Sequence, residues 1–378
     1  MRILLMSFGS MGDVVPFVAL AQALRRRGHQ PILALPTHLV RHVERYKVPI
    51  VPLGPDLSAE YQAAQMRLIE GRFTQEDVDR GHQLMAAIGP QVLRTIAPLA
   101  MSSDVLVSLY GMPFVDILQR TTKIPVVALR IVYPGHEKPG PDSHKRATPH
   151  GVTSFKPALD VYALSRTIFN PPDLPANHHV IGFFFFEDDG FRPSPELSAF
   201  LQRGPAPVVF SLGSVVHADP VRISEMFRDV TVRIGCRAII QSGWSGLGRD
   251  LALPETIFAT EYAPYGWLFQ QAACVVHAAS SGATAWSLWA DAPMVLIPHI
   301  LDQFPIAQNA AEHGSVGGLI PYQELTIEAL ESSLRKTIDN AQIHSAAQAV
   351  GKIVRGEGGL EAACDLIETL PPRSRTTL

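Results

Sequence analysis

Small and polar residues that could hold a phosphorylated sugar gather between positions 272 and 303. His277 ends a short apolar run, and the small residues 280–284 (SSGAT) follow where a turn would open into a helix. At a helix start several backbone N–H groups are unpaired and the positive end of the helix dipole faces outward, which makes a seat for phosphate. Asp302 and Gln303 follow a second apolar run, and their acceptor and donor groups could read sugar hydroxyls. The stretch therefore predicts a site for a sugar that carries a diphosphate.

A second set of chemical groups lies near the N-terminus, in the turn after the apolar run 3–6. Two glycines there let the backbone pass close to a ligand, and Asp13 is expected at the N-cap of a helix over 14–27. A carboxylate in this place could take the proton of an attacking hydroxyl, or it could simply cap the helix. The full Gly-x-Gly-x-x-Gly fingerprint is absent, as is the acidic residue expected about 20 positions later, so NAD binding is not predicted.

The elements that must position these groups alternate along the chain. Apolar runs typical of buried strands fall at 3–6, 31–35, 50–53, 105–109 and 125–129, and again at 207–212, 237–241, 257–262, 273–276 and 294–297. Helical patterns separate most of them, which predicts two parallel α/β sheets whose strands deliver the polar turns to one edge. Between 132 and 179 eight prolines predict a long loop, with a helical stretch at 156–169, and 179–186 is predicted as a strand.

Composition favours a compact, two-domain protein. At 378 residues the chain exceeds one ordinary core, and its net charge of −3 gives no general attraction to nucleic acid. Cys236, Cys274 and Cys364 are far apart and odd in number, which indicates a reduced chain without a disulfide framework. No cleavage signal follows Met1, and no run of roughly 18 apolar residues occurs, so we expect a cytoplasmic protein without a membrane span.

The stretch from 272 to 303 resembles the nucleotide-sugar segment of the family 1 glycosyltransferases, nearest to the bacterial rhamnosyltransferases and antibiotic glycosyltransferases. That segment usually has His, a Gly-rich turn, Gly-Thr-Thr, a helix, Pro and an Asp-Gln pair. His277, residues 280–284, Pro298 and the pair Asp302-Gln303 match it. The sequence departs from the pattern at 278, where Ala replaces a second His of many members, and at 279–280, where Ala-Ser replaces Gly-Gly.

The N-terminal turn matches a second pattern of the same family. Gly9 to Pro16 fits Gly-Ser-x-Gly-Asp-Val-x-Pro, in which the Asp is the general base. The resemblance covers nearly the whole chain and implies the GT-B architecture, in which two Rossmann-like domains with parallel sheets face each other across a cleft. It assigns 1–186 to an acceptor-binding domain, 187–205 to a linker, 206–358 to a nucleotide-sugar-binding domain, and 359–378 to a C-terminal helix that crosses back to the first domain.

The implied reaction is inverting transfer of a hexose from a UDP- or dTDP-linked donor to a hydroxyl of a small, apolar acceptor, either a natural product or a lipid. Asp13 would be the general base, within an acceptor-side loop of Gly9, Ser10, Met11 and Gly12. The diphosphate would be held by Gly213, Ser214, His277, Ser280, Ser281, Gly282, Ala283 and Thr284, and the sugar by Asp302 and Gln303. Backbone groups of Tyr262 and Ala263 would bind the base, while Trp244 either stacks on it or packs in the core.

No cofactor or metal is implied. The one Asp-x-Asp, at 77–79, lies in a polar helical stretch and is interpreted as a solvated helix face, whereas metal-dependent transferases carry theirs right after a strand. His136, His144 and His150 are spaced irregularly, which favours a solvated loop over a zinc site. The expected partners are the nucleotide sugar and its acceptor, with membrane contact only through a lipophilic acceptor, in a monomer or homodimer.

Two other functions are compatible with the sequence. Nucleotide-sugar epimerases share the architecture and the donor site, but they need further acidic residues in the cleft and bind no acceptor. A non-catalytic binding protein would explain the altered turn at 278–280 and the short acceptor region. Asp13 in its Gly-Ser-x-Gly-Asp turn favours the transferase over the epimerase, and donor hydrolysis or transfer would separate both alternatives from it.

Overall fold

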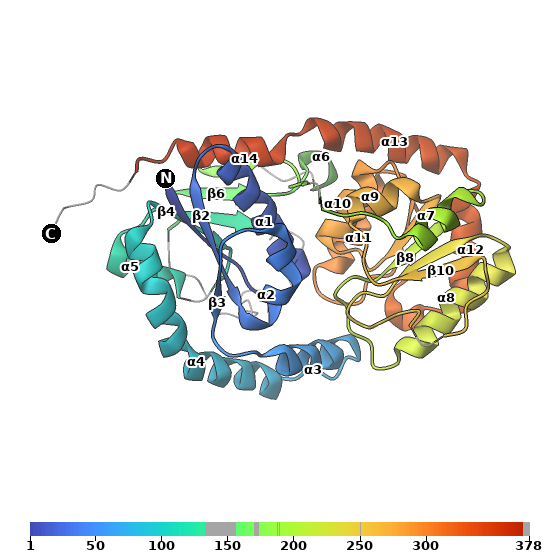
Figure 1. Ribbon diagram of the computed structural model, residues 1–378, viewed down its shortest axis with the longest axis horizontal. Helices are drawn as coiled ribbons and strands as arrows, with labels where there is room; N and C mark the ends of the chain where they lie inside the picture. Colours follow the sequence, from blue (N-terminus) through green and yellow to red (C-terminus); the bar gives the residue numbers. More distant parts are fainter. Residues whose placement is uncertain are drawn as a thin grey trace. The chain divides into compact units, whose positions relative to one another are not determined.

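The computed structural model describes residues 1–112, 114–132, 156–169, 174–186, 188, 190–249 and 251–372. The chain divides into two compact units. Unit 1 comprises residues 1–64, 72–185 and 357–378, and unit 2 comprises residues 65–71 and 186–356. Each unit has its own parallel sheet with helices (Figure 1), which is the predicted α/β class.

Unit 1 is built on a parallel sheet with the strand order β3-β2-β1-β4-β5-β6-β7 over its described residues. The strands are β1 (Arg2–Met6), β2 (Gln30–Pro36), β3 (Ile50–Leu53), β4 (Val105–Leu109), β5 (Val126–Arg130), β6 (Leu159–Tyr162) and β7 (His178–Val180). The helices are α1 (Met11–Arg26), α2 (Thr37–Val43), α3 (Ser58–Ile69, in unit 1 up to Ala64), α4 (Gln75–Ser102), α5 (Val115–Thr122), α6 (Arg166–Phe169) and α14 (Gly359–Glu368).

Strand β1, which lies inside this sheet between β2 and β4, is apolar because both of its faces are covered. All four residues of β1 after Arg2 are buried, as expected for a parallel strand with helices on either side. Helix α1 buries Val14, Phe17 and Leu24, whose spacing of three, then seven, places them on one helical face. The turn between β1 and α1 is thereby held at the carboxyl edge of the sheet.

Unit 2 carries the second parallel sheet, with the order β10-β9-β8-β11-β12-β13. Its strands are β8 (Val208–Ser211), β9 (Ala238–Gln241), β10 (Ile257–Thr260), β11 (Cys274–His277), β12 (Met294–Leu296) and β13 (Val316–Leu319). Its helices are α7 (Pro195–Gln202), α8 (Pro220–Ile234), α9 (Tyr265–Leu268), α10 (Ser281–Trp289), α11 (Gln303–Glu312), α12 (Ile327–Ile338) and α13 (Ala341–Gly356). Residues 65–71 also belong to this unit, and Ile69 is buried in its core.

Two expectations about the local structure between 156 and 186 were wrong, and one strand was missed. The stretch 156–169 is not one helix: it holds strand β6 and the single turn α6. The strand expected over 179–186 is only the short β7, which ends at Val180. Strand β13 was not predicted, although it completes the edge of the second sheet beside β12.

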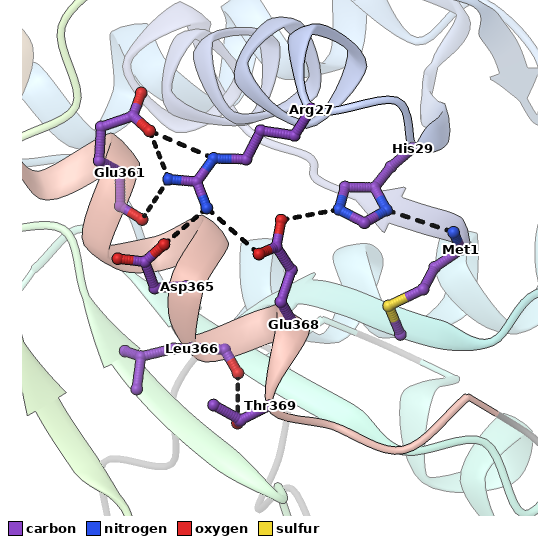
Figure 2. A network of polar contacts seen from close by, with 8 residues as sticks. All are labelled: Met1, Arg27, His29, Glu361, Asp365, Leu366, Glu368 and Thr369. Atoms are coloured by element: carbon purple, nitrogen blue, oxygen red, sulfur yellow. Dashed lines mark hydrogen bonds and ion pairs between the residues drawn. The ribbon is translucent and has the colours of Figure 1, made fainter.

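A polar network fastens the C-terminal helix α14 to helix α1 within unit 1 (Figure 2). The guanidinium of Arg27 donates to Glu361 and, at 2.6 Å, to Asp365. His29 Nδ1 accepts from the amino group of Met1 at 3.2 Å, and its Nε2 lies 2.9 Å from Glu368. Glu361 and Asp365 raise the pKa of Arg27, so the cation is held charged between them.

Helix α4 is, by length and composition alone, the one helix in the described part of the chain that could cross a membrane, and 22% of its most apolar 18-residue window is buried. Its polar N-terminus is an exposed capping box in which Asp77 accepts from the backbone N–H of Thr74 at 2.9 Å. The Asp-x-Asp at 77–79 thus serves the first turn of α4. All three cysteines are free thiols.

Candidate functional site

The turn between β11 and α10 leaves backbone donors open at a helix start. Ser280 is the N-cap: its Oγ accepts from Ala283 N at 3.4 Å, and its carbonyl accepts from Thr284 N at 2.9 Å. The amides of Ser281 and Gly282 precede the first intrahelical bond, and both residues are only half-buried. The positive end of α10 is therefore accessible to an anion. Thr284, in contrast, is fully buried.

His277 adds a second donor to this turn. Its Nδ1 accepts from Ala279 N at 3.1 Å, so this nitrogen is unprotonated. Burial lowers the pKa of His277 to about 3, so the ring is neutral and its proton is on Nε2. Nε2 is buried and has no hydrogen-bond partner in the parts of the chain that the structure describes. A buried N–H without an acceptor is unfavourable, and a phosphate oxygen would satisfy it.

Ala279 has a backbone conformation that favours glycine. Its φ is 57°, in the left-handed region, and it is fully buried. The position is one of the two where the resembling family has Gly. This chain thus makes its turn with a residue for which the backbone conformation is strained.

The ends of β8 and β9 meet in a buried polar cluster beside the same edge. Ser211 Oγ lies 2.8 Å from Gln241 Oε1 and 3.1 Å from the Tyr265 hydroxyl, and Gln241 Nε2 donates to the carbonyl of Ala263 at 2.7 Å. Gly213 and Ser214, in the loop after β8, are half-buried. The Gly213 carbonyl accepts from Trp244 N at 2.9 Å, which joins the loop after β8 to the loop after β9.

The residues expected to bind the base have partners inside unit 2. The Tyr262 hydroxyl donates to Asp188 at 2.9 Å, and the Tyr262 ring meets Phe191 edge to face. Ala263 is buried, and its carbonyl is already an acceptor for Gln241. Trp244 is half-buried, a burial compatible with either of its two predicted roles.

The side-chain oxygen of Gln303 accepts hydrogen bonds from the backbone of its own loop. Its Oε1 accepts from His299 N at 2.7 Å and from Ile300 N at 3.2 Å. Because Oε1 already accepts these two hydrogen bonds, only Nε2 is left to contact a ligand. Gln303 would therefore donate to an acceptor atom of the ligand. Asp302 precedes it as the N-cap of α11 and is half-buried.

In unit 1 the expected catalytic residue lies in the turn between β1 and α1. Ser10, and not Asp13, is the N-cap of α1, and the helix begins at Met11 instead of Val14. Asp13 is the third helical residue of a capping box, where its Oδ2 accepts from Ser10 N at 2.7 Å and from Ser10 Oγ at 3.0 Å. A side chain at Gly9, which has φ 99°, would place its Cβ 2.5 Å from Asp13 Oδ2, so this carboxylate needs glycine there.

Burial raises the pKa of Asp13, and the hydrogen bonds from Ser10 act in the opposite direction. Asp13 is thus an acid whose charged form is disfavoured by its surroundings, as is typical of groups that exchange protons. The half-buried Met11 and Gly12 complete the turn.

Three histidines near these turns had no counterpart among the sequence predictions. His38 on α2 is buried, stacks on Tyr61 at 5.7 Å, and has both ring nitrogens without a partner in the described chain. His217 and His299, in the loops after β8 and β12, hydrogen-bond to each other at 3.0 Å. A histidine in a loop leaves no periodic pattern in the sequence. The contacts of His38 with Tyr61 and of His217 with His299 are therefore found only in the fold.

Within the residues that the structure describes, no group of three or more His, Cys, Asp or Glu side chains could hold a metal ion. His136, His144 and His150 lie outside the described residues.

Comparisons with family models identify two segments. Residues 3–88 match the model described as the glycosyltransferase family 28 N-terminal domain. Residues 232–356 match the model for the C-terminal domain of proteins like erythromycin biosynthesis protein CIII.

Curated relatives match over almost the full length. An O-mycaminosyltylonolide 6-deoxyallosyltransferase of Streptomyces fradiae is 29% identical, with 97% of each chain covered. A vancomycin aglycone glucosyltransferase of Amycolatopsis orientalis is also 29% identical, with 98% of each chain covered. A sterol 3-beta-glucosyltransferase of Arabidopsis thaliana is 26% identical over 98% of this chain and 68% of its own.

Solved structures match the fold. A spinosyn rhamnosyltransferase complexed with thymidine diphosphate has a TM-score of 0.73 at 18% identity, over 97% of this chain and 100% of its own. The calicheamicin glycosyltransferase has a TM-score of 0.72 at 18% identity, over 98% of each chain. Both sheets and their helices are therefore those of an architecture that sugar-transferring enzymes use.

Proposed function

This chain belongs to the family 1 glycosyltransferases of GT-B fold, in the bacterial antibiotic branch, and on that premise we propose that it transfers a hexose from a dTDP- or UDP-linked donor to a hydroxyl of a small apolar acceptor. The enzyme class follows from the relatives and the family models. The donor, the acceptor, the stereochemistry and the residue roles are our proposals.

The donor diphosphate would lie at the start of α10, and this feature carries the proposal. Ser281 and Gly282 offer open amides, and the unsatisfied Nε2–H of His277 belongs to the same turn. Together they supply donors and a positive dipole end, which stabilise the charge that develops on a leaving diphosphate without a metal. Gly213 and Ser214 would add backbone and hydroxyl donors from the loop after β8, and Ala283 and Thr284 would complete the helix turn behind them.

Asp302 and Gln303 would read the sugar. Because the Oε1 of Gln303 is taken up by its own loop, its Nε2 would donate to a sugar oxygen, while the carboxylate of Asp302 would accept from sugar hydroxyls. The two side chains thus have complementary roles. Backbone groups at Tyr262 and Ala263, with the ring of Trp244, would hold the base.

The nucleotide is proposed from the neighbours. The spinosyn rhamnosyltransferase was solved with thymidine diphosphate, and another structural match, at 18% identity with a TM-score of 0.68, was solved in complex with dTDP. The names of the curated relatives give O-mycaminosyltylonolide, vancomycin aglycone and sterols as their acceptors. We therefore place the acceptor among small, largely apolar alcohols.

Asp13 would take the proton of the acceptor hydroxyl as that oxygen attacks the anomeric carbon. One base and one leaving group on opposite sides of that carbon give a single displacement, which inverts the anomeric centre. Gly9, Ser10, Met11 and Gly12 would form the acceptor-side loop around it. The domain limits of the sequence prediction, 1–186 and 206–358 with the linker and the returning helix, belong to this proposal.

The test is thermal melting against dTDP, UDP and GDP and their hexose conjugates, since a ligand that binds only the folded state raises the midpoint. We expect dTDP or UDP to stabilise the protein, and Asp302→Ala to remove the preference among sugars of that nucleotide while the nucleotide itself still binds. A well-folded protein that no nucleotide stabilises would instead be a non-catalytic relative. Conversion of the donor sugar to an isomer without an acceptor would identify an epimerase.

A further inference from the structure

A buried chain of hydrogen bonds joins the loops that carry the predicted donor residues. His217 follows Gly213 and Ser214 in the loop after β8, and His299 precedes Asp302 and Gln303 in the loop after β12. Their Nε2 atoms lie 3.0 Å apart. The two rings are 5% and 2% exposed, so water does not compete for this bond.

The neighbours of the two rings determine where the protons are. His299 Nδ1 lies 2.6 Å from the carbonyl of Ile297, which can only accept, so Nδ1 carries the proton. In the neutral ring Nε2 of His299 is then an acceptor, and Nε2 of His217 must donate to it. Burial lowers the pKa of His217 to about 4 and that of His299 to about 3, in agreement with two neutral rings at pH 7.

The other end of the chain reaches a third loop. With its proton on Nε2, His217 presents Nδ1 as an acceptor to the Oγ of Ser245, 3.0 Å away. Ser245 follows Trp244 in the loop after β9, and its Oγ also accepts from His217 N at 2.8 Å. Ser245 Oγ also donates to the carbonyl of Val215 at 2.9 Å, so the direction that the rings fix is His217 to His299 to Ile297.

Packing holds the second ring in place. The ring of Tyr322, from the segment after β13, stacks on His299 with a centroid distance of 4.4 Å and an interplanar angle of 19°. The backbone N–H of His299 is the group that Gln303 Oε1 accepts at 2.7 Å. His299 is thus hydrogen-bonded both to His217 and to Gln303, the residue expected to bind the sugar.

We propose that His217 and His299 are positioning residues of the donor site, whose mutual hydrogen bond sets the diphosphate loop after β8 and the sugar loop after β12 at the separation that a nucleotide sugar requires. This inference rests on the proposed function. Neither ring contacts the ligand: the pair acts through the loops. Loss of the bond leaves both loops folded but lets their spacing vary, so affinity for the nucleotide sugar falls while the helix start at α10 is untouched.

The two nitrogens of each ring allow substitutions that delete only this bond. Asn reproduces the position of Nδ1, so His299→Asn keeps the donor to Ile297 and His217→Asn keeps the acceptor for Ser245. Gln reproduces the position of Nε2, so His299→Gln keeps an acceptor for His217. The Asn variants therefore break the bond between the loops, and the Gln variant retains it.

The experiment is calorimetric titration at pH 7 of the full chain with the nucleotide sugar that melting identifies and with its nucleoside diphosphate. We expect His299→Asn to weaken binding of the nucleotide sugar roughly tenfold, the effect of one lost buried hydrogen bond, and His299→Gln to stay within about threefold of wild type. Because both histidines act through one bond, the double variant His217→Asn/His299→Asn should bind no more weakly than either single variant.

Two results would overturn the inference. In one, His299→Asn lowers the melting midpoint while its affinity for the nucleotide sugar equals that of wild type, which makes the bond merely structural. In the other, His299→Gln is as weak as His299→Asn. Failure of the proposed function has a separate signature, because wild type itself would then bind no nucleotide sugar.

Discussion

Asp13 carries a charge that its surroundings disfavour. Burial raises the pKa of its carboxyl, although Ser10 donates two hydrogen bonds to Oδ2. A base with a raised pKa takes up a proton more readily at neutral pH than an exposed aspartate does. The same carboxylate belongs to the capping box of α1, so its proposed catalytic role and its structural role must be separated by experiment.

Asp13→Asn separates them, because the amide oxygen can still accept from Ser10 but cannot take a proton. We expect transfer to slow by about 10² to 10⁴, the usual contribution of a general base, with an unchanged or higher melting midpoint. Asp77→Asn is the matched control, since Asp77 occupies the same capping-box position at the start of α4. Retained activity in Asp13→Asn, or an equal loss in Asp77→Asn, would contradict the role.

The raised pKa also fixes the direction of the pH dependence. The base must be ionised, so kcat/KM should climb as pH rises through the pKa of Asp13, which lies above the value of about 3.9 of an exposed aspartate. Stability changes in the opposite sense: the protonated carboxyl contributes stability that is fully present below the unfolded pKa and is lost as pH rises through the folded pKa. A pH profile and a set of urea melts measure both, and Asp13→Asn should lack the stability change.

Among the elements, the turn before α10 is the one whose sequence departs from the family pattern. Ala279 holds φ at 57° there, where L side chains are strained by about 1–2 kcal/mol. Replacement by Gly relieves that strain but adds about 0.5–1 kcal/mol of chain entropy to the unfolded state. An Ala-to-Gly substitution usually destabilises a protein, but at this position it should be neutral or stabilising by up to about 1.5 kcal/mol.

Urea unfolding of Ala279→Gly and Ala278→Gly checks this expectation. Ala278 is the adjacent buried alanine, and its φ is not in the left-handed region. We expect Ala278→Gly to lower the free energy of unfolding by about 0.5–1 kcal/mol and Ala279→Gly not to lower it. Equal losses in the two variants would show that the turn is not strained.

Element prediction succeeded where the pattern of apolar residues was strong and failed where tertiary contacts decided. Strand β13 contains Gly317 and Gly318, which have low strand propensity, so its pattern was weak. A Cβ at these positions would meet Thr337 Oγ1 at 1.9 Å and Ser333 Cβ at 2.4 Å, so close packing of α12 requires the glycines. The sequence around β13 alone does not reveal this contact with α12.

Strand β6 was also missed, because it contains a buried charged residue. Asp160 is only 2% exposed, yet an aspartate in a sequence indicates a surface. It is buried because Arg130 on the neighbouring strand donates to both of its oxygens, at 2.5 and 2.7 Å. A partner 30 residues away cannot be found from local periodicity, and the stretch was therefore misread as helix.

At the scale of the whole molecule, the fold class could be predicted, and so could the place of the two turns at the carboxyl ends of strands, because each turn comes after an apolar run. Asp13 and the pair 302–303 come after strands of parallel sheets, and His277 is the last residue of β11. The histidine pair could not be predicted, since its members are 82 residues apart and meet only when β8 and β12 are in place. The sequence therefore indicates which groups lie at the carboxyl edge of each sheet, whereas the hydrogen bonds between loops are found only in the structure.

The division into two units predicts how a nucleotide would affect stability. Every residue proposed to hold the donor lies in unit 2, whereas Asp13 lies in unit 1, and each unit has its own buried core. A ligand stabilises the unit that binds it, by about 2.7 kcal/mol at a concentration of 100 times Kd. Two such units need not unfold in one transition, so a single midpoint can hide which of them responds.

Native-state hydrogen exchange resolves the units, because it reports the opening of each strand separately. With dTDP or UDP at saturation we expect slower exchange in β8, β11 and β12 than in the free protein, and little change in β1, β4 and β5. Asp302→Ala should preserve this response to the bare nucleotide, since the proposal gives Asp302 only the sugar. Protection that rises equally in both sheets would mean that the nucleotide is not confined to unit 2, and slower exchange in β1 alone would place it at the Asp13 turn, contrary to the assignment of the donor to α10.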